Sequence, residues 1–195
     1  LLEPIVRKGN RLSVGNFDPC AILLNNDLSS GIPDNLKNLD QIIIPPIHAG
    51  WTTRLKSQHF TAYDRVAQEF AELINIDAWL INPYFNSCGK IDFHEEKGVD
   101  CVAATVDEIL SNIKEKYTQY GVKEEPFVIV KADAGTYGMG IMTVKDGADV
   151  YKLNRKQRNK MAKIKEGLSV SHVLVQEGVY TFESIHQAVA EPVIY

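Results

Sequence analysis

Short apolar runs separated by turn-forming residues make up the first half of the chain. The runs at residues 21–24 and 41–44 predict strands, and a pair of prolines stops the second one. A third apolar run, at residues 79–81, predicts another strand. The segment that follows it, residues 82–90, is rich in turn-forming residues and predicts a loop.

Two segments have the apolar spacing of a helix. In residues 61–76 one helix face is predicted to carry Val66, Phe70, Leu73 and Ile74. Further on, Thr105 and Glu108 have the spacing of a capping box, so Thr105 is the predicted N-cap of a helix that ends near Gly121. The apolar face of that helix carries Val106, Ile109, Ile113 and Tyr117. The alternation of strands and helices predicts a three-layer α/β unit over residues 1–120.

The pattern changes at residues 122–126, which we predict to separate an N-terminal domain, residues 1–122, from a second domain, residues 123–195. In the second domain strands are predicted at residues 127–130, 141–144, 173–176 and 189–195. A very basic helix is predicted at about residues 153–167. The chain stops in an apolar, strand-like run, which indicates a fragment of a longer protein.

The loop at residues 135–140 reads Gly-Thr-Tyr-Gly-Met-Gly. Glycines let successive backbone N–H groups approach an anion closely, because no Cβ blocks the way. A Walker loop or a dinucleotide fingerprint would lead into a helix, whereas a strand follows this loop. We therefore expect a β-hairpin that covers phosphates. Lys131 ends the incoming strand on the face opposite Val128 and Val130, from which its ammonium could reach those phosphates. The alternative is a solvated lysine beside a hairpin turn.

Residues 173–179 form an apolar strand that ends in polar side chains. The edge of such a strand can pair with an adenine ring through its backbone groups. Gln176 or Glu177 could then accept a hydrogen bond from the exocyclic amine, and Glu183 could bind the ribose hydroxyls. Gln and Glu are common on protein surfaces, so their presence alone is weak evidence. Their position after the lysine and the glycine-rich loop is what favours the hypothesis that they bind a nucleotide.

Residues 50–60 place two cations just before the predicted helix. A carboxylate or phosphate could bind Arg54 in a bidentate manner, with Lys56 adding charge. The alternative is a loop whose hydroxyl side chains cap the helix. Asn82 lies in the loop after a predicted strand, where ligands gather in α/β layers. Lys90 or Lys97 could supply a second cation for phosphate.

The net charge of −4 gives no general reason to expect binding to nucleic acid or to an anionic membrane. No apolar run approaches the roughly 20 residues that span a bilayer. Cys20, Cys88 and Cys101 have no CxxC or zinc spacing, which favours a reducing compartment, the cytoplasm. The basic block at residues 155–165 predicts a solvated helix face, although it could also steer ATP or bind nucleic acid.

Three phrases together resemble the small lobe of the ATP-grasp superfamily: residues 130–133, 135–140 and 175–179. Within that superfamily the chain resembles the proteobacterial-type glutamate–cysteine ligases over nearly its whole length. The phrases that carry this resemblance lie at residues 50–60, 81–85, 131–141, 153–161 and 176–183.

The resemblance implies an ATP-grasp fold with an N-terminal pre-ATP-grasp domain, in a chain that ends before the second lobe is complete. It implies ATP-dependent joining of the γ-carboxyl of L-glutamate to the amine of L-cysteine through an acyl phosphate. Lys131 and Arg54 would be catalytic, and Arg54, Lys56 and Asn82 would bind substrate. ATP would contact Lys131, Gly135, Thr136, Tyr137, Gly138, Met139, Gly140, Gln176, Glu177, Val179 and Glu183. Magnesium is also implied, with ligands expected after residue 195.

Three other functions stay open at this level. The chain could belong to another ATP-grasp ligase that joins different amino acids or peptides. It could be a nucleotide-binding module without catalysis, or an RNA-binding accessory protein that uses the helix at residues 155–165. The resemblance favours small-molecule partners over nucleic acid or membrane, and it leaves a homo-oligomer open.

Overall fold

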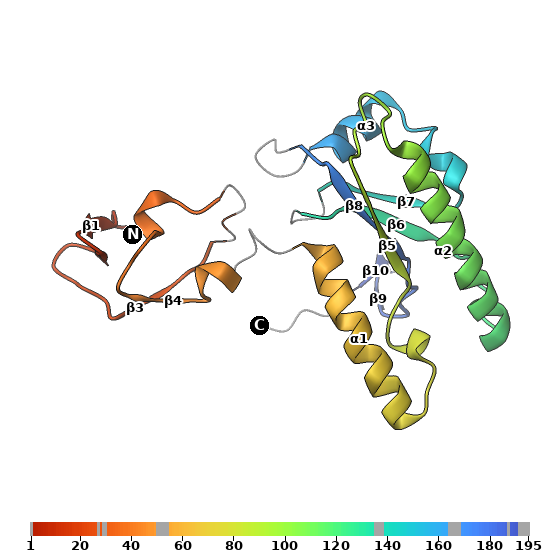
Figure 1. Ribbon diagram of the computed structural model, residues 1–195, viewed down its shortest axis with the longest axis horizontal. Coiled ribbons are helices and arrows are strands. Elements are labelled where there is room, and N and C mark those ends of the chain that lie inside the picture. The colour runs from red at the N-terminus through yellow and green to blue at the C-terminus, as the bar shows by residue number, and fades with distance from the viewer. Residues whose placement is uncertain are drawn as a thin grey trace.

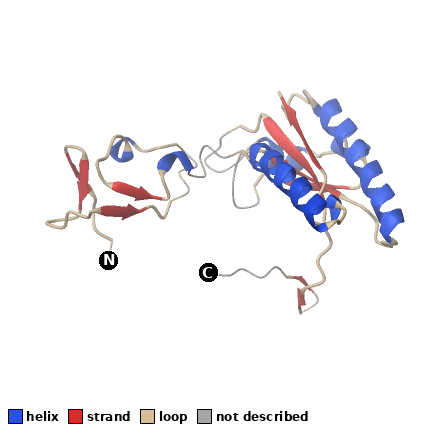
Figure 2. Ribbon diagram, turned by 60° about the horizontal axis from the view of Figure 1, so that its bottom comes forward, coloured by secondary structure: helices blue, strands red, loops and turns tan. Residues whose placement is uncertain are grey.

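The computed structural model describes residues 2–26, 28, 31–49, 55–134, 139–163, 169–186 and 188–190. It is a mixed α/β structure of helices and short strands. Figures 1 and 2 show two groups of elements, one before residue 50 and one after residue 54, and each has a hydrophobic core of its own.

The first group contains two small sheets. An antiparallel pair is formed by β1 (Val6–Lys8) and β2 (Arg11–Ser13), and a parallel pair by β3 (Ala21–Leu23) and β4 (Ile42–Ile44). The short helices are η1 (Asp34–Leu36) and η2 (Ile47–Ala49). The strands predicted at residues 21–24 and 41–44 are confirmed. In the described residues they form a sheet of two strands, however, and not the middle layer of the three-layer unit predicted over residues 1–120.

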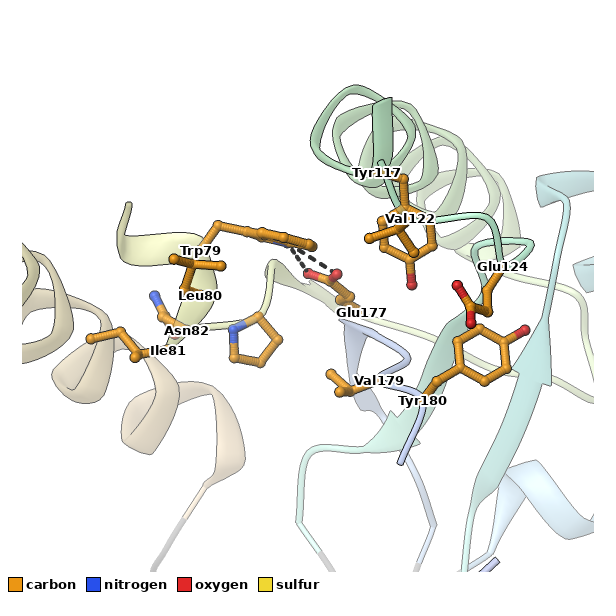
Figure 3. Close-up of a pocket in the computed structure, with 11 residues that line it drawn as sticks. Trp79, Leu80, Ile81, Asn82, Tyr117, Val122, Glu124, Glu177, Val179 and Tyr180 are labelled. Atoms are coloured by element: carbon orange, nitrogen blue, oxygen red, sulfur yellow. Dashed lines mark hydrogen bonds between the residues drawn. The ribbon is translucent and has the colours of Figure 1, made fainter. Parts of the chain in front are cut away.

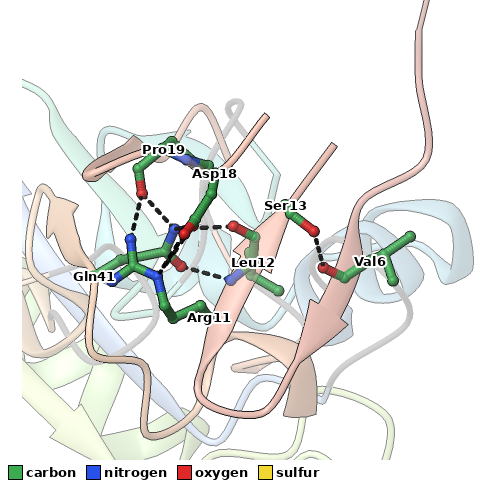
Figure 4. A network of polar contacts seen from close by, with 7 residues as sticks. All are labelled: Val6, Arg11, Leu12, Ser13, Asp18, Pro19 and Gln41. Atoms are coloured by element: carbon green, nitrogen blue, oxygen red, sulfur yellow. Dashed lines mark hydrogen bonds and ion pairs between the residues drawn. The ribbon is translucent and has the colours of Figure 1, made fainter. Parts of the chain in front are cut away.

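A buried glutamine joins the first group together (Figure 4). The side-chain amide of Gln41 accepts a hydrogen bond from the backbone N–H of Leu12 at 2.6 Å and donates one to the carbonyl of Leu12 at 2.9 Å. It therefore pairs with β2 as a neighbouring strand would. The same amide donates to the carbonyl of Pro19 at 2.6 Å, so its buried polar atoms are satisfied.

The second group is built on a four-stranded antiparallel sheet with the strand order β5–β8–β6–β7. Its strands are β5 (Phe85–Gly89), β6 (Val128–Ala132), β7 (Ile141–Val144) and β8 (His172–Glu177). The last three confirm the strands predicted at residues 127–130, 141–144 and 173–176. Although β8 is the last of the four in sequence, it lies inside the sheet, between β5 and β6.

Two helices, α2 (Val99–Tyr120) and α3 (Arg155–Ala162), cover one face of this sheet. Ile113 of α2 and Val130 and Val173 of the sheet are completely buried in the shared core. The apolar face predicted for α2 is confirmed, and Gly121 ends the helix with a positive φ of 69°, as predicted. The basic helix is shorter than predicted, and Asn154 and Gln157 form a capping box at its start.

The predicted start of α2 is wrong. The helix begins at Val99, and Thr105 is a buried residue inside it. The apolar face continues back through Val99 and Val102, so packing against the sheet extends the helix beyond the local capping signal. The prediction also missed β5 and placed a strand at residues 79–81, where the structure has the 3-10 helix η3 (Ala78–Leu80).

The helix predicted at residues 61–76 is confirmed as α1 (Lys56–Ile74), but its burial is not the one that the apolar spacing suggests. Val66, Phe70, Leu73 and Ile74 are all exposed, Leu73 to 81%. The buried residues are Ala67 and Ala71, and Phe60 stacks on Phe85 with a ring separation of 5.4 Å. Phe85 points away from α2, so α1 contacts the opposite face of the sheet.

The main core spans residues 88–175. Its sheet takes β5 from before residue 122 and the other strands from after it, and α2 packs on β5, β6 and β8. The boundary predicted at residues 122–126 therefore runs through this core. The observed division between cores falls between residues 47 and 79 instead.

The remaining elements are short. The 3-10 helix η4 (Gly147–Val150) packs on α2, and a small antiparallel hairpin joins β9 (Ser184–Ile185) to β10 (Ala188–Val189). The strand predicted at residues 189–195 overlaps β10 by one residue, and residues 191–195 lie outside the described part. Among the described helices, none has both the length and the apolar character needed to cross a membrane.

Replacing Ile113 with alanine should lower the free energy of unfolding by about 2 to 5 kcal/mol, because the side chain is fully buried between α2 and the sheet. Denaturant unfolding measures this change. The neighbouring exposed residue offers the control, since Lys114→Ala should alter stability by no more than about 0.5 kcal/mol. Equal effects of the two substitutions would contradict the observed packing of α2.

Candidate functional site

Lys131 lies near the end of β6, on the sheet face opposite Val128 and Val130, as the alternation along the strand predicts. Its ammonium donates a hydrogen bond to Oε1 of Gln176 on the neighbouring strand β8. The same ammonium lies 5.1 Å from the centroid of the Phe60 ring on α1, within the range of a cation–π interaction. The structure thus brings together two residues predicted to bind ATP and adds an aromatic side chain from α1.

Lys56 brings a second positive charge to the end of β6. Its Nζ donates to the carbonyl oxygens of Ala132 at 2.7 Å and Asp133 at 3.3 Å. Burial lowers the pKa of Lys131, and the positive charge of Lys56 lowers it further. Two cations therefore meet at the base of the glycine-rich hairpin. An anion bound between them would reduce their mutual repulsion, which makes this place suited to phosphate.

Asp133 fixes the start of α1 beside these lysines. Its buried carboxylate accepts hydrogen bonds from the backbone N–H and the hydroxyl of Ser57, both at 2.7 Å. Its carbonyl accepts from the backbone N–H of Lys56 at 3.1 Å. Leu55, the N-cap residue of α1, has no side-chain cap, so Asp133 satisfies N–H groups that would otherwise lack partners. No local pattern indicates this contact, because Asp133 and Ser57 are 76 residues apart.

The predicted glycine-rich hairpin is confirmed at its base. β6 and β7 pair antiparallel, and the backbone N–H of Ala132 donates to the carbonyl of Gly140 at 2.8 Å. Gly140 has a positive φ of 62°, a conformation that favours glycine. Met139 is partly exposed beside it. The other predicted loop residues, Gly135, Thr136, Tyr137 and Gly138, lie outside the described residues.

Glu177, next to Gln176 on β8, points to the opposite face of the sheet (Figure 3). Its carboxylate accepts hydrogen bonds from Nε1 of Trp79 and from the backbone N–H of Tyr84, each at 3.0 Å. Burial raises the pKa of Glu177, and the two hydrogen bonds oppose that rise. The two residues proposed from the sequence as alternatives for adenine therefore differ: Gln176 lies with Lys131, and Glu177 does not.

Glu177 lines a cavity of about 530 Å³ together with Val179. The other residues around it, drawn in Figure 3, are Trp79, Leu80, Ile81, Asn82, Pro83, Tyr117, Val122, Glu124 and Tyr180. Most of this lining is apolar, with Glu177 as a buried polar group in the wall. Glu183 is exposed directly before β9. The residues predicted to bind adenine and ribose therefore lie in different parts of the structure. Gln176 lies beside Lys131, whereas Glu177 lines the cavity and Glu183 is exposed.

Asn82 is buried between that cavity and a second one of about 310 Å³. Its Nδ2 donates to Oδ1 of Asp64 on α1 at 2.6 Å. Its Oδ1 is buried and finds no hydrogen-bond partner within the described part of the chain. Buried polar atoms are seldom left unpaired, so Oδ1 marks a place where a donor group would be stabilised.

The second cavity is polar. It is lined by Asp64, Gln68, Asp77, Ala78, Trp79, Asn82, Pro83, Tyr84, Phe85 and Lys116. Lys116 is paired with Asp77, which also accepts a hydrogen bond from the hydroxyl of Tyr120 at 2.9 Å. These contacts lower the pKa of Asp77 and raise that of Lys116, so both groups are charged at neutral pH.

Two of the three residues predicted to bind substrate lie within the described residues, in different places. Lys56 lies at the end of β6, Asn82 lies between the two cavities, and Arg54 is outside the described residues. In the ranges that the structure describes, no group of three or more His, Cys, Asp or Glu side chains is arranged to hold a metal ion.

A sequence profile of the glutamate-cysteine ligase family matches residues 1–195. The chain belongs to the glutamate-cysteine ligase family. This chain is also similar to a crystal structure, at 1.90 Å resolution, of a protein from Methylobacillus flagellatus KT that carries the name gamma-glutamylcysteine synthetase. The two are 68% identical with a TM-score of 0.83, over 92% of this chain and 42% of that one. The chain therefore spans less than half of that relative. Comparison with curated proteins finds no match.

The raised pKa of Glu177 predicts a pH effect on the stability of this chain. A carboxyl group with a folded-state pKa above its unfolded value favours folding most at low pH and loses that contribution as pH rises. Glu177→Gln cannot ionise and can still accept from Trp79 and Tyr84. The free energy of unfolding of this variant, relative to wild type, should therefore increase as pH rises above the ordinary value of 4.5.

Urea unfolding over a pH series measures this difference. Glu115→Gln, which changes an exposed carboxylate on α2, is the matched control. A trend of the same size in both variants would mean that burial of Glu177 is not its source.

Proposed function

We propose that this chain is part of an ATP-dependent ligase that joins the γ-carboxyl of L-glutamate to the amine of L-cysteine. The observation that carries the proposal is the pair of lysines, Lys131 and Lys56, at the base of a glycine-rich hairpin in a chain of this family. Both features suit a polyphosphate, because the lysines supply positive charge and the loop supplies backbone N–H groups. The described residues offer no comparable cationic arrangement beside a glycine-rich turn.

The proposed chemistry has two steps. The γ-carboxylate attacks the terminal phosphorus of ATP, forming an acyl phosphate and releasing ADP. The amine of cysteine then attacks the acyl carbon, forming the amide and releasing phosphate. A carboxylate needs this activation because its oxygen is otherwise a poor leaving group. Lys131 and Lys56 would stabilise the negative charge on the phosphoryl group during its transfer.

The fold is consistent with an ATP-grasp small lobe, which we also propose. Residues 123–195 supply the hairpin, the basic helix α3 and strand β8, and residues 1–122 supply β5 and α1 to the same unit. In this arrangement Gln176 would contact the nucleotide beside Lys131, and Gly135, Thr136, Tyr137 and Gly138 would be further ATP-binding residues. Arg54 would add a further cation from just before α1. Glu177 would act through its backbone, since its side chain is committed to Trp79 and Tyr84.

We assign Asn82 and Asp64 to the α-ammonium group of L-glutamate. That group stays positively charged throughout the reaction, whereas the amine of cysteine must be neutral to attack. Asn82 and Asp64 both line a polar cavity, and Oδ1 of Asn82 is buried without a hydrogen-bond partner in the described residues, which suits an ammonium group bound there. Asp64 lies two turns along α1 from Lys56, roughly 12 Å of helix, which leaves room for the substrate and the transferred phosphoryl group between them.

Magnesium belongs to the proposed reaction as a counterion of ATP, but the described residues hold no acidic cluster that fits it. We therefore assign it no ligand and no step. The cysteines of the structure are free thiols, which supports the reducing cytoplasm as the place of the reaction. The proposed partners are the small molecules ATP, L-glutamate and L-cysteine, without nucleic acid or membrane.

The decisive experiment measures ADP release by the full-length protein with Mg-ATP, in the presence and absence of each amino acid. Release that needs both L-glutamate and L-cysteine is the expected result. Release with a different pair of substrates would keep the ligase chemistry and replace the named substrates. Saturable ATP binding without any release would favour a nucleotide-binding module.

In the same protein, Lys131→Ala should weaken ATP binding by about 10- to 100-fold, the loss expected when one or two hydrogen bonds to a charged group are removed. Isothermal titration with a non-hydrolysable ATP analogue measures the affinity. Lys145→Ala is the control, because Lys145 lies just after β7, exposed and paired with Glu125. Unchanged affinity in Lys131→Ala would refute the assignment of the phosphate site.

Asn82→Leu should raise the KM for L-glutamate by about 10-fold, because it keeps the branching of the side chain but removes the Oδ1 acceptor for the charged ligand. It also removes the hydrogen bond from Nδ2 to Asp64, the second residue assigned to the same ammonium group. The KM values for L-cysteine and ATP should change little, a selectivity that general damage to the fold would not produce. Asn86→Leu alters an exposed Asn on β5 and serves as the control. A rise confined to the KM for L-cysteine would assign this cavity to the other amino acid.

A further inference from the structure

Two cysteines on different elements of the main core face each other. Cys88 is buried on β5, and Cys101 is exposed in the first turn of α2. Their sulfur atoms are 2.8 Å apart, with the thiol of Cys101 donating to that of Cys88. The Sγ atom of Cys88 also lies 3.3 Å from the hydroxyl of Thr105, one turn further along α2.

We propose that Cys88 and Cys101 are a site of reversible oxidation, which closes to a disulfide between β5 and the first turn of α2. A disulfide bond is about 2.05 Å long, so the two sulfur atoms need to approach by less than about 1 Å. The elements that carry them are already packed in one core, so neither has to move far. This inference does not depend on the substrates proposed above.

The surroundings of the two thiols give them different roles. Cys101 is accessible to oxidants, because it is exposed in the first turn of α2. Burial, followed by the hydrogen bond from Cys101, raises the pKa of Cys88 to about 11. Cys88 is therefore a thiol at neutral pH and is shielded from oxidants. Cys101 reacts first, and Cys88 follows as the resolving thiol.

The oxidant is a hydroperoxide. The thiolate of Cys101 attacks the peroxide oxygen, the O–O bond breaks, and Cys101 becomes a sulfenic acid while hydroxide leaves. The thiol of Cys88 then attacks the sulfenic sulfur. An S–S bond forms, the S–OH bond breaks, and water leaves with the proton from Cys88. Two thiols are oxidised by two electrons, the peroxide is reduced by two, and an external dithiol reverses the change.

The test treats the reduced full-length protein with hydrogen peroxide, alkylates the remaining thiols and maps the peptides by mass spectrometry. We expect one peptide pair joined through Cys88 and Cys101 that has lost two hydrogen atoms, and its disappearance after treatment with dithiothreitol. Cys20, exposed in the other group of elements, should remain available to alkylation and serves as the internal reference.

Three variants separate this site from general oxidation. Cys88→Ala should stop at a sulfenic acid on Cys101, trapped by dimedone, and Cys101→Ser should leave Cys88 reduced. Cys20→Ser should form the disulfide as wild type does. The oxidised wild-type protein should also melt at a higher temperature than the reduced form, a difference absent in Cys101→Ser. Alkylation of Cys88 as a free thiol in protein whose Cys101 has been oxidised would overturn the proposal.

Discussion

A buried carboxylate, that of Asp133, holds the first turn of α1 against the base of the β6–β7 hairpin. Taking a carboxylate out of water is costly, and here the cost is offset by two hydrogen bonds from Ser57. The carboxylate also stabilises the N-terminal end of α1, because that end carries partial positive charge and has no side-chain cap from its own N-cap residue. Without the Ser57 donors the carboxylate of Asp133 would lose these two hydrogen bonds, and without that carboxylate the Ser57 groups would lose their acceptor.

The position of the two lysines follows from this contact. Lys56 is the first residue of α1, so fixing the helix start also fixes the ammonium group near Lys131. Phe60, one turn later, then lies against both Phe85 and the ammonium of Lys131. A cationic pocket is thus assembled from a helix and a hairpin that are far apart in sequence. The hydrogen bonds of Asp133 with Ser57 and of Lys56 with the carbonyl of Ala132 hold the two lysines close together despite their repulsion.

Sequence patterns predicted most of the regular elements of the main core. They also predicted which face of β6 carries Lys131. Strict alternation along β6 separated Lys131 from its valine neighbours correctly, because a strand has a period of two whatever packs on it. The start of α2 was wrong because long-range packing outweighed the capping signal at Thr105. The exposed face of α1 was also misjudged, since apolar spacing reports which residues share a face and not whether anything covers it.

The site itself could be predicted only in part. Lys131 and Gln176 were both predicted to bind ATP, and they face one another because β6 and β8 are neighbouring strands. The sequence left Gln176 and Glu177 as alternatives, and one step of the pleat places their side chains on opposite faces of the sheet. Asp133 and the pair Cys88–Cys101 depend on contacts between separate elements. No periodicity or local spacing carries information about such contacts.

The strand order also has a consequence for how the chain assembles during its synthesis. β6 and β7 are joined by a short hairpin and can pair as soon as both exist, but β5 pairs only with β8 in the described sheet. β8 is made last and enters between β5 and β6, where it supplies hydrogen bonds to both. Until β8 is made, β5 has no partner strand in the described sheet and α2 can pack on β6 but not on the strand between β5 and β6. Closing so long a loop is slow. A ribosome that stalls before residue 172 would therefore hold an open, apolar half-sheet, a natural substrate for chaperones.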